Sequence, residues 1–434
     1  MSTLGLRDHL THRGNLRSSR YGWLRLTPMY SVHLVEQLLA EDAIHDGRVL
    51  DPFCGTGTTA LVCAERGVPC DTTDINPFLL WLAQAKTHSY TADAIATARE
   101  HAAAIVAAAT DVARGREWVP PLSNIEKWWE PLVLDALSRA WGEISRRSAT
   151  IPRPASWLLV VAFLRTAIRT ARVSFGHQSM SFSRSGDGSR QLSLTEAREP
   201  ASSVQAEWEA AISSVAEAAH SPVGTEPQVL HCDARELTHV LDRRSYVSVI
   251  TSPPYCNRMS YIRELRPYMY WMKYLRDARA AGELDWQAIG GTWGTATSNL
   301  AKWEPDPSAA IPFVGFDRIV SGVSRNAARH SDILARYIAK YFHDTVLHAR
   351  ELFEVVQPEG AIHYIVGNSK VLRRRRPNAR AVRRNLPSSG IRGRLDHDAA
   401  QENVEEGALR VPRLGRPAVA PGPSLRRRAP AGAR

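Results

Sequence analysis

Two glycines and two acidic residues in the first part of the chain have the types and spacing of a ligand site. An apolar run at residues 48–50 ends at Asp51, and Phe53, Gly55 and Gly57 follow before a helical pattern begins. Glycines let the backbone approach a ligand, and the helix offers its N-terminal amides. The lysine of a triphosphate-binding loop is missing. Because a carboxylate at Asp51 would repel phosphate, the pattern favours a cationic ligand.

Three further strand-like segments each end in a polar residue. Asp74 follows the glycines by about 20 residues, the spacing at which an acid binds ribose hydroxyls. Residues 229–232 lead into Asp233, and residues 246–251 lead into Ser252-Pro-Pro-Tyr255, here called the Pro-Pro turn. An open parallel sheet binds its ligands at the carboxyl ends of its strands. The sequence therefore predicts one site at this edge, for a ligand that contains a ribose.

The segment Asp51-Pro-Phe-Cys-Gly-Thr-Gly-Thr, taken with the Pro-Pro turn, resembles the DNA amino-methyltransferases, which use S-adenosylmethionine. The resemblance implies a class I, Rossmann-like α/β fold and a flipped target base. Residues 26–39 resemble the helix that closes over the cofactor in that family. Carried over by position, the implied roles are methionine binding for Asp51, Phe53, Gly55 and Gly57, ribose binding for Asp74, adenine binding for Asp233, and base binding for Ser252, Pro253, Pro254 and Tyr255.

The chemistry of an exocyclic base amine explains why such a turn is needed. The nitrogen lone pair is delocalised into the ring until hydrogen-bond acceptors localise it towards the methyl group. The Ser252 hydroxyl and the Pro253 carbonyl would be those acceptors, and the prolines hold the backbone without adding a competing donor. The Tyr255 ring would stack on the extruded base. Methyl transfer is then direct, with proximity and desolvation as its main catalytic effects.

The first residue of the Pro-Pro turn bears on the choice of base. In the family that the chain resembles, serine is most frequent in cytosine-N4 enzymes, so Ser252 favours N4-methylation of cytosine. Aspartate or asparagine is usual in adenine-N6 enzymes and aspartate in RNA guanine-amine enzymes, and both classes remain alternatives. A cytosine-C5 enzyme needs a cysteine where Tyr255 stands, and Cys256 comes one residue late.

The chain divides into four segments by composition. Residues 1–90 and 226–370 hold the predicted methyltransferase motifs, and residues 91–225 read as a helical insertion that is a candidate for target recognition. Its Arg165, Arg169 and Arg172 run at helical spacing into a loop at residues 173–190 suited to phosphate and base contacts. A solvated helix face is the alternative. Residues 286–303, after the Pro-Pro turn, are a second candidate for recognition.

The last segment, residues 371–434, carries the excess positive charge. It has 16 arginines, no lysine and five acidic residues, whereas the other 370 residues balance at 39 basic and 39 acidic side chains. It lacks Phe, Trp and Tyr, and cannot build a core. We expect a disordered arm that binds DNA or, slightly favoured, the product of a frameshift in a GC-rich gene. On either reading the C-terminal hairpin of the family is missing.

Composition indicates a cytoplasmic enzyme. The N-terminus is too polar for a signal peptide, no apolar stretch spans a membrane, and the five cysteines contain no Cys-x-x-Cys pair, so neither membrane attachment nor a metal site is expected. The expected partners are double-stranded DNA and, by family habit, a cognate restriction endonuclease. A chain that binds DNA without turnover is the alternative outside enzymes.

Overall fold

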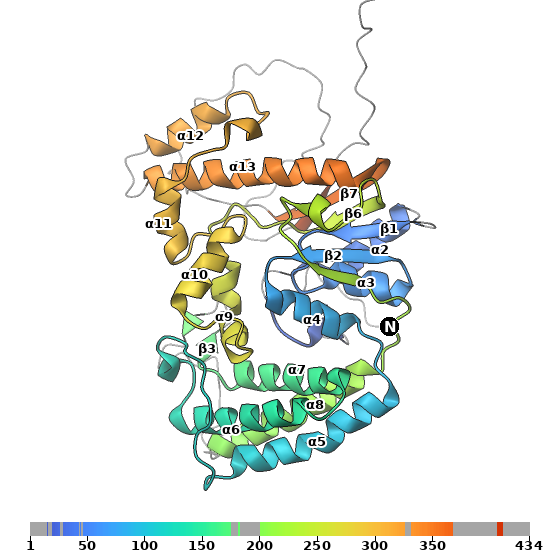
Figure 1. Ribbon diagram of the computed structural model, residues 1–434, viewed down its shortest axis with the longest axis vertical. Helices are drawn as coiled ribbons and strands as arrows, with labels where there is room; N and C mark the ends of the chain where they lie inside the picture. The colour runs from blue at the N-terminus through green and yellow to red at the C-terminus, as the bar shows by residue number, and fades with distance from the viewer. Residues whose placement is uncertain are drawn as a thin grey trace, which may run out of the picture.

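The computed structural model describes residues 15, 20–26, 29–42, 44, 47–174, 181–182, 200–325, 331–367 and 406–410. Its centre is a six-stranded sheet with helices on both faces (Figure 1). This α/β, Rossmann-like architecture confirms the predicted fold class. The strands of the sheet are β1 (Arg48–Asp51), β2 (Cys70–Asp74), β5 (Gln228–His231), β6 (Tyr246–Thr251), β7 (Val356–Gly367) and β8 (Glu406–Arg410).

The order of the strands places a ligand crevice at the middle of the sheet. They lie in the order β5-β2-β1-β6-β7-β8, and the first five are parallel. Counted along the chain, the parallel strands run 3-2-1-4-5, which is the doubly wound order. The order reverses between β1 and β6, so the carboxyl ends of these two strands open a crevice. Asp51 ends the first of them and Ser252 follows the second.

Successive residues of the central strands point to opposite faces of the sheet, because side chains alternate along a strand. They therefore pack against different helices. Val49 and Ile250 pack with residues of the helices α2 and α3, whereas Leu50 and Val249 pack with residues of α13. Both faces are therefore covered, as in other parallel sheets. The helices next to the sheet are α2 (Val32–Glu41), α3 (Thr58–Arg66), α4 (Pro77–Thr87) and α13 (Ser331–Val355).

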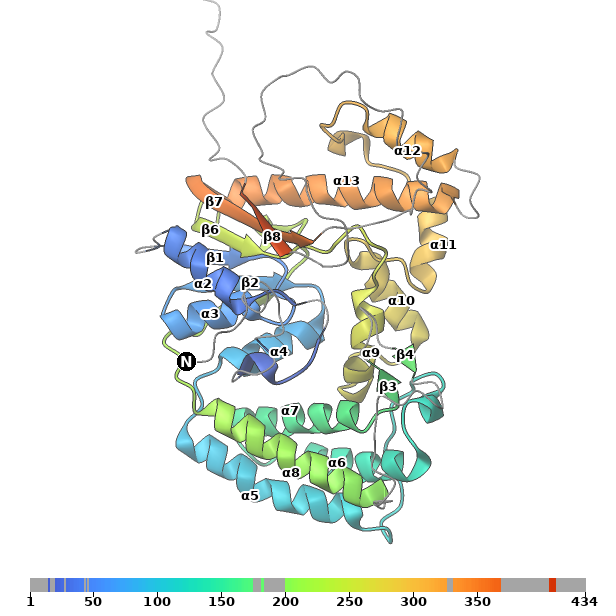
Figure 2. The same cartoon turned by 180° about the vertical axis from the view of Figure 1, so that it is seen from behind.

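The insertion is a bundle of long helices that lies apart from the sheet, below α4 in Figure 1. Figure 2 shows from behind that α8 and α5 run side by side there. A short two-stranded ladder, β3 (Val173–Ser174) with β4 (Ser181–Phe182), follows α7. The helices of the bundle are α5 (Ala92–Thr110), α6 (Pro131–Ser148), α7 (Arg153–Arg169) and α8 (Pro200–Ala219).

One hydrophobic core joins this bundle to the helix that follows the Pro-Pro turn. Trp271, at the end of α9, lies with its ring 5.8 Å from that of Trp129 and 5.0 Å from that of Phe163. Tyr268 and Tyr270 are also buried. The bundle therefore supports the helix that borders the site. The helices of this region are α9 (Tyr261–Trp271), α10 (Ala278–Gln287), α11 (Thr295–Lys302) and α12 (Phe316–Ser324).

The C-terminal segment differs from expectation at one place. Residues 406–410 form β8, which pairs antiparallel with β7 from His363↔Arg410 to Gly367↔Glu406. The expectation that nothing after Lys370 forms a strand is therefore wrong for these five residues. Without β8, β7 would be an edge strand with unpaired backbone N–H and C=O groups. These groups can pair with a further strand independently of the side chains of that strand. The rest of residues 371–434 lies outside the described part.

Among the described residues, no helix is both long enough and apolar enough to cross a membrane.

Candidate active site

An open cavity with about 990 Å³ of empty space, part of it open to solvent, lies at the carboxyl ends of β1, β2, β5 and β6. Seven of the ten predicted site residues line the cavity; Asp51, Gly57 and Tyr255 do not. The predicted residues that line it are Phe53, Gly55, Asp74, Asp233, Ser252, Pro253 and Pro254.

The glycine turn after β1 takes a shape that other residues disfavour. Gly55 and Gly57 have φ angles of +51° and +74°, in the left-handed region. A Cβ atom on Gly57 would also lie 3.2 Å from the Cβ of Ala83 in α4. Buried Lys86 donates from Nζ to the Thr56 carbonyl at 3.0 Å, and burial lowers the pKa of this amine to about 7. The turn is thus held close to α4, with its other side towards the cavity.

Asp51 lies beneath the turn and is fully buried. Its Oδ1 accepts hydrogen bonds from the Thr251 hydroxyl at 2.6 Å and the Phe53 amide at 3.2 Å, and its Oδ2 accepts from the Tyr30 hydroxyl at 3.0 Å. Burial raises the pKa of Asp51 to about 7, although these hydrogen bonds favour the charged form. The carboxylate thus ties β1, β6 and the segment before α2 together behind the site.

Asp74 and Asn76 shape the part of the cavity next to the glycine turn. Asp74 accepts from the Gly55 amide at 3.1 Å and from the Asn76 amide at 2.9 Å. Burial raises its pKa to about 6. The Asn76 side chain caps α4 by accepting from the Phe78 amide. Because Asn76 serves as the cap, the carboxylate of Asp74 lines the cavity instead.

Asp233 belongs to a chain of alternating charges that reaches α13. Its two oxygens accept from Arg235 at 2.9 and 2.6 Å, and Arg235 also pairs with Asp344 at 3.0 Å. Asp344 in turn pairs with Lys340 at 2.5 Å. Burial opposes ionisation of Asp233, but the hydrogen bonds and charge of Arg235 outweigh it and hold the pKa below its usual range. Arg235 also donates to the carbonyl of Gln287 at 2.7 Å, which connects the chain to the end of α10.

The Ser252 hydroxyl has a fixed direction. It donates to the carbonyl of Ile365 in β7 at 2.9 Å and lies 3.0 Å from the Tyr255 hydroxyl. Since a hydroxyl has one proton and two lone pairs, donation to Ile365 leaves the oxygen as an acceptor. The side chain also lines the cavity. Ser252 can therefore accept a hydrogen bond from a ligand amine.

The backbone of the Pro-Pro turn is held by two tyrosines from other elements. The Tyr341 hydroxyl of α13 donates to the Pro254 carbonyl at 2.8 Å, and the Tyr255 amide donates to the Tyr261 hydroxyl at 3.2 Å. Within the described part of the chain, no donor engages the Pro253 carbonyl. This carbonyl and the Ser252 hydroxyl are thus two neighbouring acceptors at the cavity wall.

Comparison with known proteins gives a short similarity. Over 72 residues the chain is 32% identical to proteins named type II methyltransferase M.AvaI from Nostoc sp. and from Anabaena variabilis. The similarity supports a methyltransferase. It covers 16% of this chain and 15% of the length of each relative. No family model matches the chain, and no solved structure does.

The arginines proposed for DNA contact in the insertion have partners within the protein. Arg165 donates to the carbonyls of Gly22 and Trp23 at 2.9 and 3.2 Å. Arg169 pairs with Glu207 at 2.5 Å, and Arg172 pairs with Glu130. Arg165 is therefore engaged within the protein, whereas the role of exposed Arg169 and Arg172 in phosphate contact stays a prediction. Residues 175–180 and 183–190 of the adjoining loop lie outside the described part.

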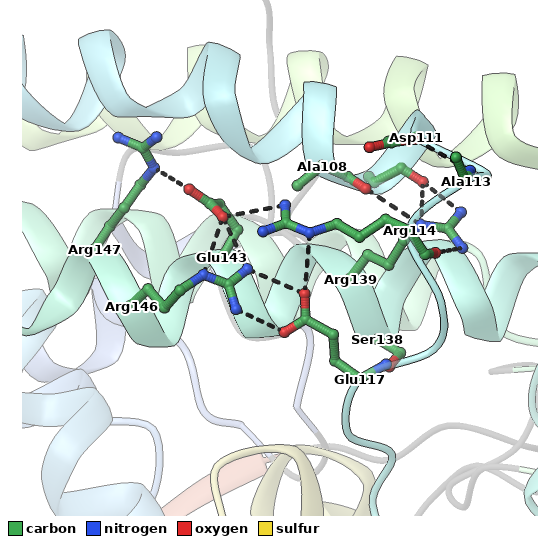
Figure 3. Close-up of polar contacts among 11 residues, drawn as sticks. Ala108, Asp111, Ala113, Arg114, Glu117, Ser138, Arg139, Glu143, Arg146 and Arg147 are labelled. Carbon is green, nitrogen blue, oxygen red and sulfur yellow. Dashed lines mark hydrogen bonds and ion pairs between the residues drawn. The ribbon is translucent and has the colours of Figure 1, made fainter.

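Other arginines of the bundle also have partners within the protein. Figure 3 shows Arg146 between Glu117 and Glu143, with distances of 2.8 Å to each carboxylate. Buried Arg139 points the other way and donates to the carbonyls of Ala108 and Ala109 at the end of α5. Both arginines stabilise the bundle, Arg146 through two carboxylates and Arg139 through backbone carbonyls.

One cavity residue, Tyr30, and two tyrosines that hold the backbone beside the cavity escaped prediction because their signals are not local. Tyr30 lies within the segment predicted to close over the cofactor, but its hydroxyl contact with Asp51 needs the folded chain. Tyr341 and Tyr337 stand one helical turn apart on α13, and this spacing could have suggested a shared face.

Among the described residues, no group of three or more potential ligands could hold a metal ion.

Proposed function

We propose that this chain is an S-adenosylmethionine-dependent DNA methyltransferase that modifies the exocyclic N4 amine of cytosine. The observation that carries the proposal is the pair of acceptors, the Ser252 hydroxyl and the Pro253 carbonyl, at the wall of the cavity. The similarity to type II methyltransferases supports the reaction class. It also leads us to propose a role in restriction and modification beside a cognate endonuclease.

The residues of the cavity suit the proposed cofactor. Asp74 and Asp233 stand at the ends of the neighbouring strands β2 and β5, where carboxylates can accept from ribose hydroxyls and from an adenine amine. Ile75 and Leu79 form an apolar surface beside them. When bound, S-adenosylmethionine supplies an electrophilic methyl group on a sulfonium sulfur. Gly55 leaves the space over the turn free of side-chain atoms for the methionine part.

The chain's own contribution to the reaction lies in the orientation of the amine. Acceptance by Ser252 and Pro253 would localise the amine lone pair on nitrogen, in line with the methyl group. The cofactor would supply the methyl group with loss of its C–S bond, and the amine that accepts it would release its surplus proton to water through the open cavity. No covalent enzyme intermediate is required. Tyr255 does not line the cavity, so its stacking on the flipped base stays a prediction.

Nucleoside mass spectrometry tests this proposal. Plasmid DNA is taken from a methylation-free bacterial host that expresses the chain, the Ser252→Ala variant, or Ser245→Ala. Ser245 stands just before β6, at the other end of the strand from the Pro-Pro turn, and serves as the matched control. We expect N4-methylcytosine with the wild type and the control, and its loss with Ser252→Ala.

Two other outcomes have definite meanings. N6-methyladenine that disappears in Ser252→Ala would keep the site and replace cytosine by adenine. No methylated base from soluble, folded wild-type protein would contradict the DNA methyltransferase, and DNA binding by that same protein would then favour a non-catalytic role.

A further inference from the structure

A tight backbone turn directly follows the Pro-Pro turn and contains an arginine in an unusual conformation. The Asn257 amide donates to the Tyr255 carbonyl at 2.8 Å, and the Met259 amide donates to the Asn257 side chain at 3.0 Å. Between them, Arg258 has a φ angle of +61°, in the left-handed region. Glycine takes this conformation at low cost, whereas a residue with a Cβ is strained there.

Two other elements hold Arg258 in this conformation. Its amide donates to the Tyr337 hydroxyl of α13 at 3.0 Å, and its carbonyl accepts from the Thr292 hydroxyl at 3.4 Å. Thr292 belongs to the loop between α10 and α11. A strained backbone persists only where its surroundings determine it, and such positions concentrate at binding sites. The backbone of Arg258 is therefore placed with precision beside the predicted base site.

The charge of Arg258 contrasts with the charges in the bundle. Its side chain is exposed, and no carboxylate among the described residues forms an ion pair with it. Arg263, in the first turn of α9, is likewise exposed and without an acidic partner in the described part. Arg146, Arg169 and Arg172 are all paired with carboxylates. Two exposed arginines, Arg258 and Arg263, thus follow the Pro-Pro turn without an acidic partner in the described part of the chain.

We propose that the guanidinium group of Arg258 binds a backbone phosphate of the DNA strand that carries the flipped nucleotide. This inference rests on the proposed function. A nucleotide can enter the site only if the phosphates beside it are held near the Pro-Pro turn. The guanidinium fork matches phosphate oxygens in charge and geometry. Glycine would form this turn without strain, and what arginine adds at this position, directly after the Pro-Pro turn, is an exposed guanidinium group.

The chain supplies a closely matched control at the opposite end of β6. Arg244 is also exposed and has a φ angle of +54°, and its amide donates to the Glu354 carbonyl at 3.0 Å. The variants Arg258→Gly and Arg244→Gly therefore remove the same charge from the same backbone conformation. Both relieve strain, so neither should lower the melting temperature. Any difference between them in DNA binding then comes from position.

The experiment measures the affinity of the full chain for duplex DNA at several salt concentrations, together with its affinity for S-adenosylmethionine. For Arg258→Gly we expect roughly fivefold weaker DNA binding and a salt slope lower by about 0.9, the value for one lost phosphate contact. Cofactor affinity should stay unchanged. For Arg244→Gly we expect the wild-type affinity and slope, and for Arg258→Lys we expect the wild-type slope.

The outcomes separate this inference from the proposed function. If the wild type binds DNA and Arg258→Gly has the same salt slope as the wild type, Arg258 does not bind phosphate and only the inference is lost. Equal losses for both glycine variants would likewise overturn it, since the effect would then be general charge. If the folded wild type binds no duplex DNA at all, the proposed function and the inference fall together.

Discussion

The two sides of the cavity are held in different ways. The glycine side comprises residues 52–56 and 74–76, and the Pro-Pro side comprises residues 252–255. On the glycine side the bonds that hold the turn come mainly from the neighbouring strand β2 and the following helix α4, as from the Cys54 amide to the Thr73 carbonyl at 2.8 Å and from Lys86 to the Thr56 carbonyl at 3.0 Å. On the Pro-Pro side they come from distant elements, since Tyr341 is 87 residues from Pro254 and Ile365 is 113 residues from Ser252.

This difference explains how one sheet could serve two ligands independently. The glycine side depends on the pairing of β1 with β2 and on the short turn between β1 and α3. The Pro-Pro side depends on how α9, α13 and β7 pack around it. We expect substitutions in the glycine side to change cofactor binding, and substitutions in remote supports to change the target side. Arg235 lies outside both sides but contacts Asp233 and the carbonyl of Gln287, two residues that line the cavity, so we expect its environment to affect both ligands.

The largest effect is expected from removal of the aromatic support of α9. Trp271→Ala leaves a cavity among Trp129, Trp141 and Phe163, and should lower the free energy of unfolding by about 3–5 kcal/mol. Urea unfolding measures it. The half-buried Trp157 on α7 provides the control, for which Trp157→Ala should cost less than half as much. Equal losses would show that the core joining the bundle to α9 is not critical.

A smaller effect should appear on both sides of the cavity at once. Asp344→Asn removes the carboxylate of α13 that pairs with Arg235. Arg235 then interacts more strongly with Asp233, so the Asp233 carboxylate is less available to a ligand. We expect cofactor binding to weaken by about 1–3 kcal/mol, with DNA binding weakened as well. Calorimetry and DNA titration measure the two effects. Glu351→Gln on the same helix is the control, because Glu351 accepts from Thr238 outside this chain of charges. If the substitution weakened the binding of only one of the two ligands, the expectation that Arg235 affects both would be wrong.

The glycine side should be sensitive to pH. Burial raises the pKa of Asp74 to about 6 in the cofactor-free protein, and ribose hydroxyls would favour the ionised form and lower this pKa. By linkage, cofactor affinity should be full above about pH 7 and fall by up to about tenfold per pH unit below pH 6. Calorimetry across this range tests it. Asp74→Asn should bind weakly with a flatter profile. A wild-type profile that is already flat would remove Asp74 from the ribose site.

The smallest effect tests one remote support of the Pro-Pro side. Tyr341→Phe removes the hydrogen bond to the Pro254 carbonyl and should slow methyl transfer to DNA about 3- to 10-fold, equivalent to about 0.5–1.5 kcal/mol. Single-turnover rates measure it, with cofactor affinity expected to stay unchanged. Tyr274→Phe removes an exposed phenol and should have no effect. If Tyr341→Phe weakened cofactor binding instead, the separation of the two sides would be wrong.

The sequence by itself determined the parallel sheet and the residues that end its strands. Strands, turns and helix starts are local features, so alternation of apolar residues and the positions of Gly55, Gly57 and Asp74 were enough to locate one edge of the sheet. The burial of Tyr268, Tyr270 and Trp271 was also predictable from helical spacing. The binding roles of the ten site residues stay predictions.

Only the tertiary structure decided which polar residues line the cavity and which face the protein interior. Asp51 points into the interior, and Arg165 binds the carbonyls of Gly22 and Trp23, although both residue types would suit a ligand. The direction of the Ser252 hydroxyl depends on Ile365, and β8 forms on the edge of β7. A hydrogen bond needs both partners in place. Periodicity of apolar residues in the sequence shows that one face of a helix or strand is buried, but it cannot show which residues that face will contact.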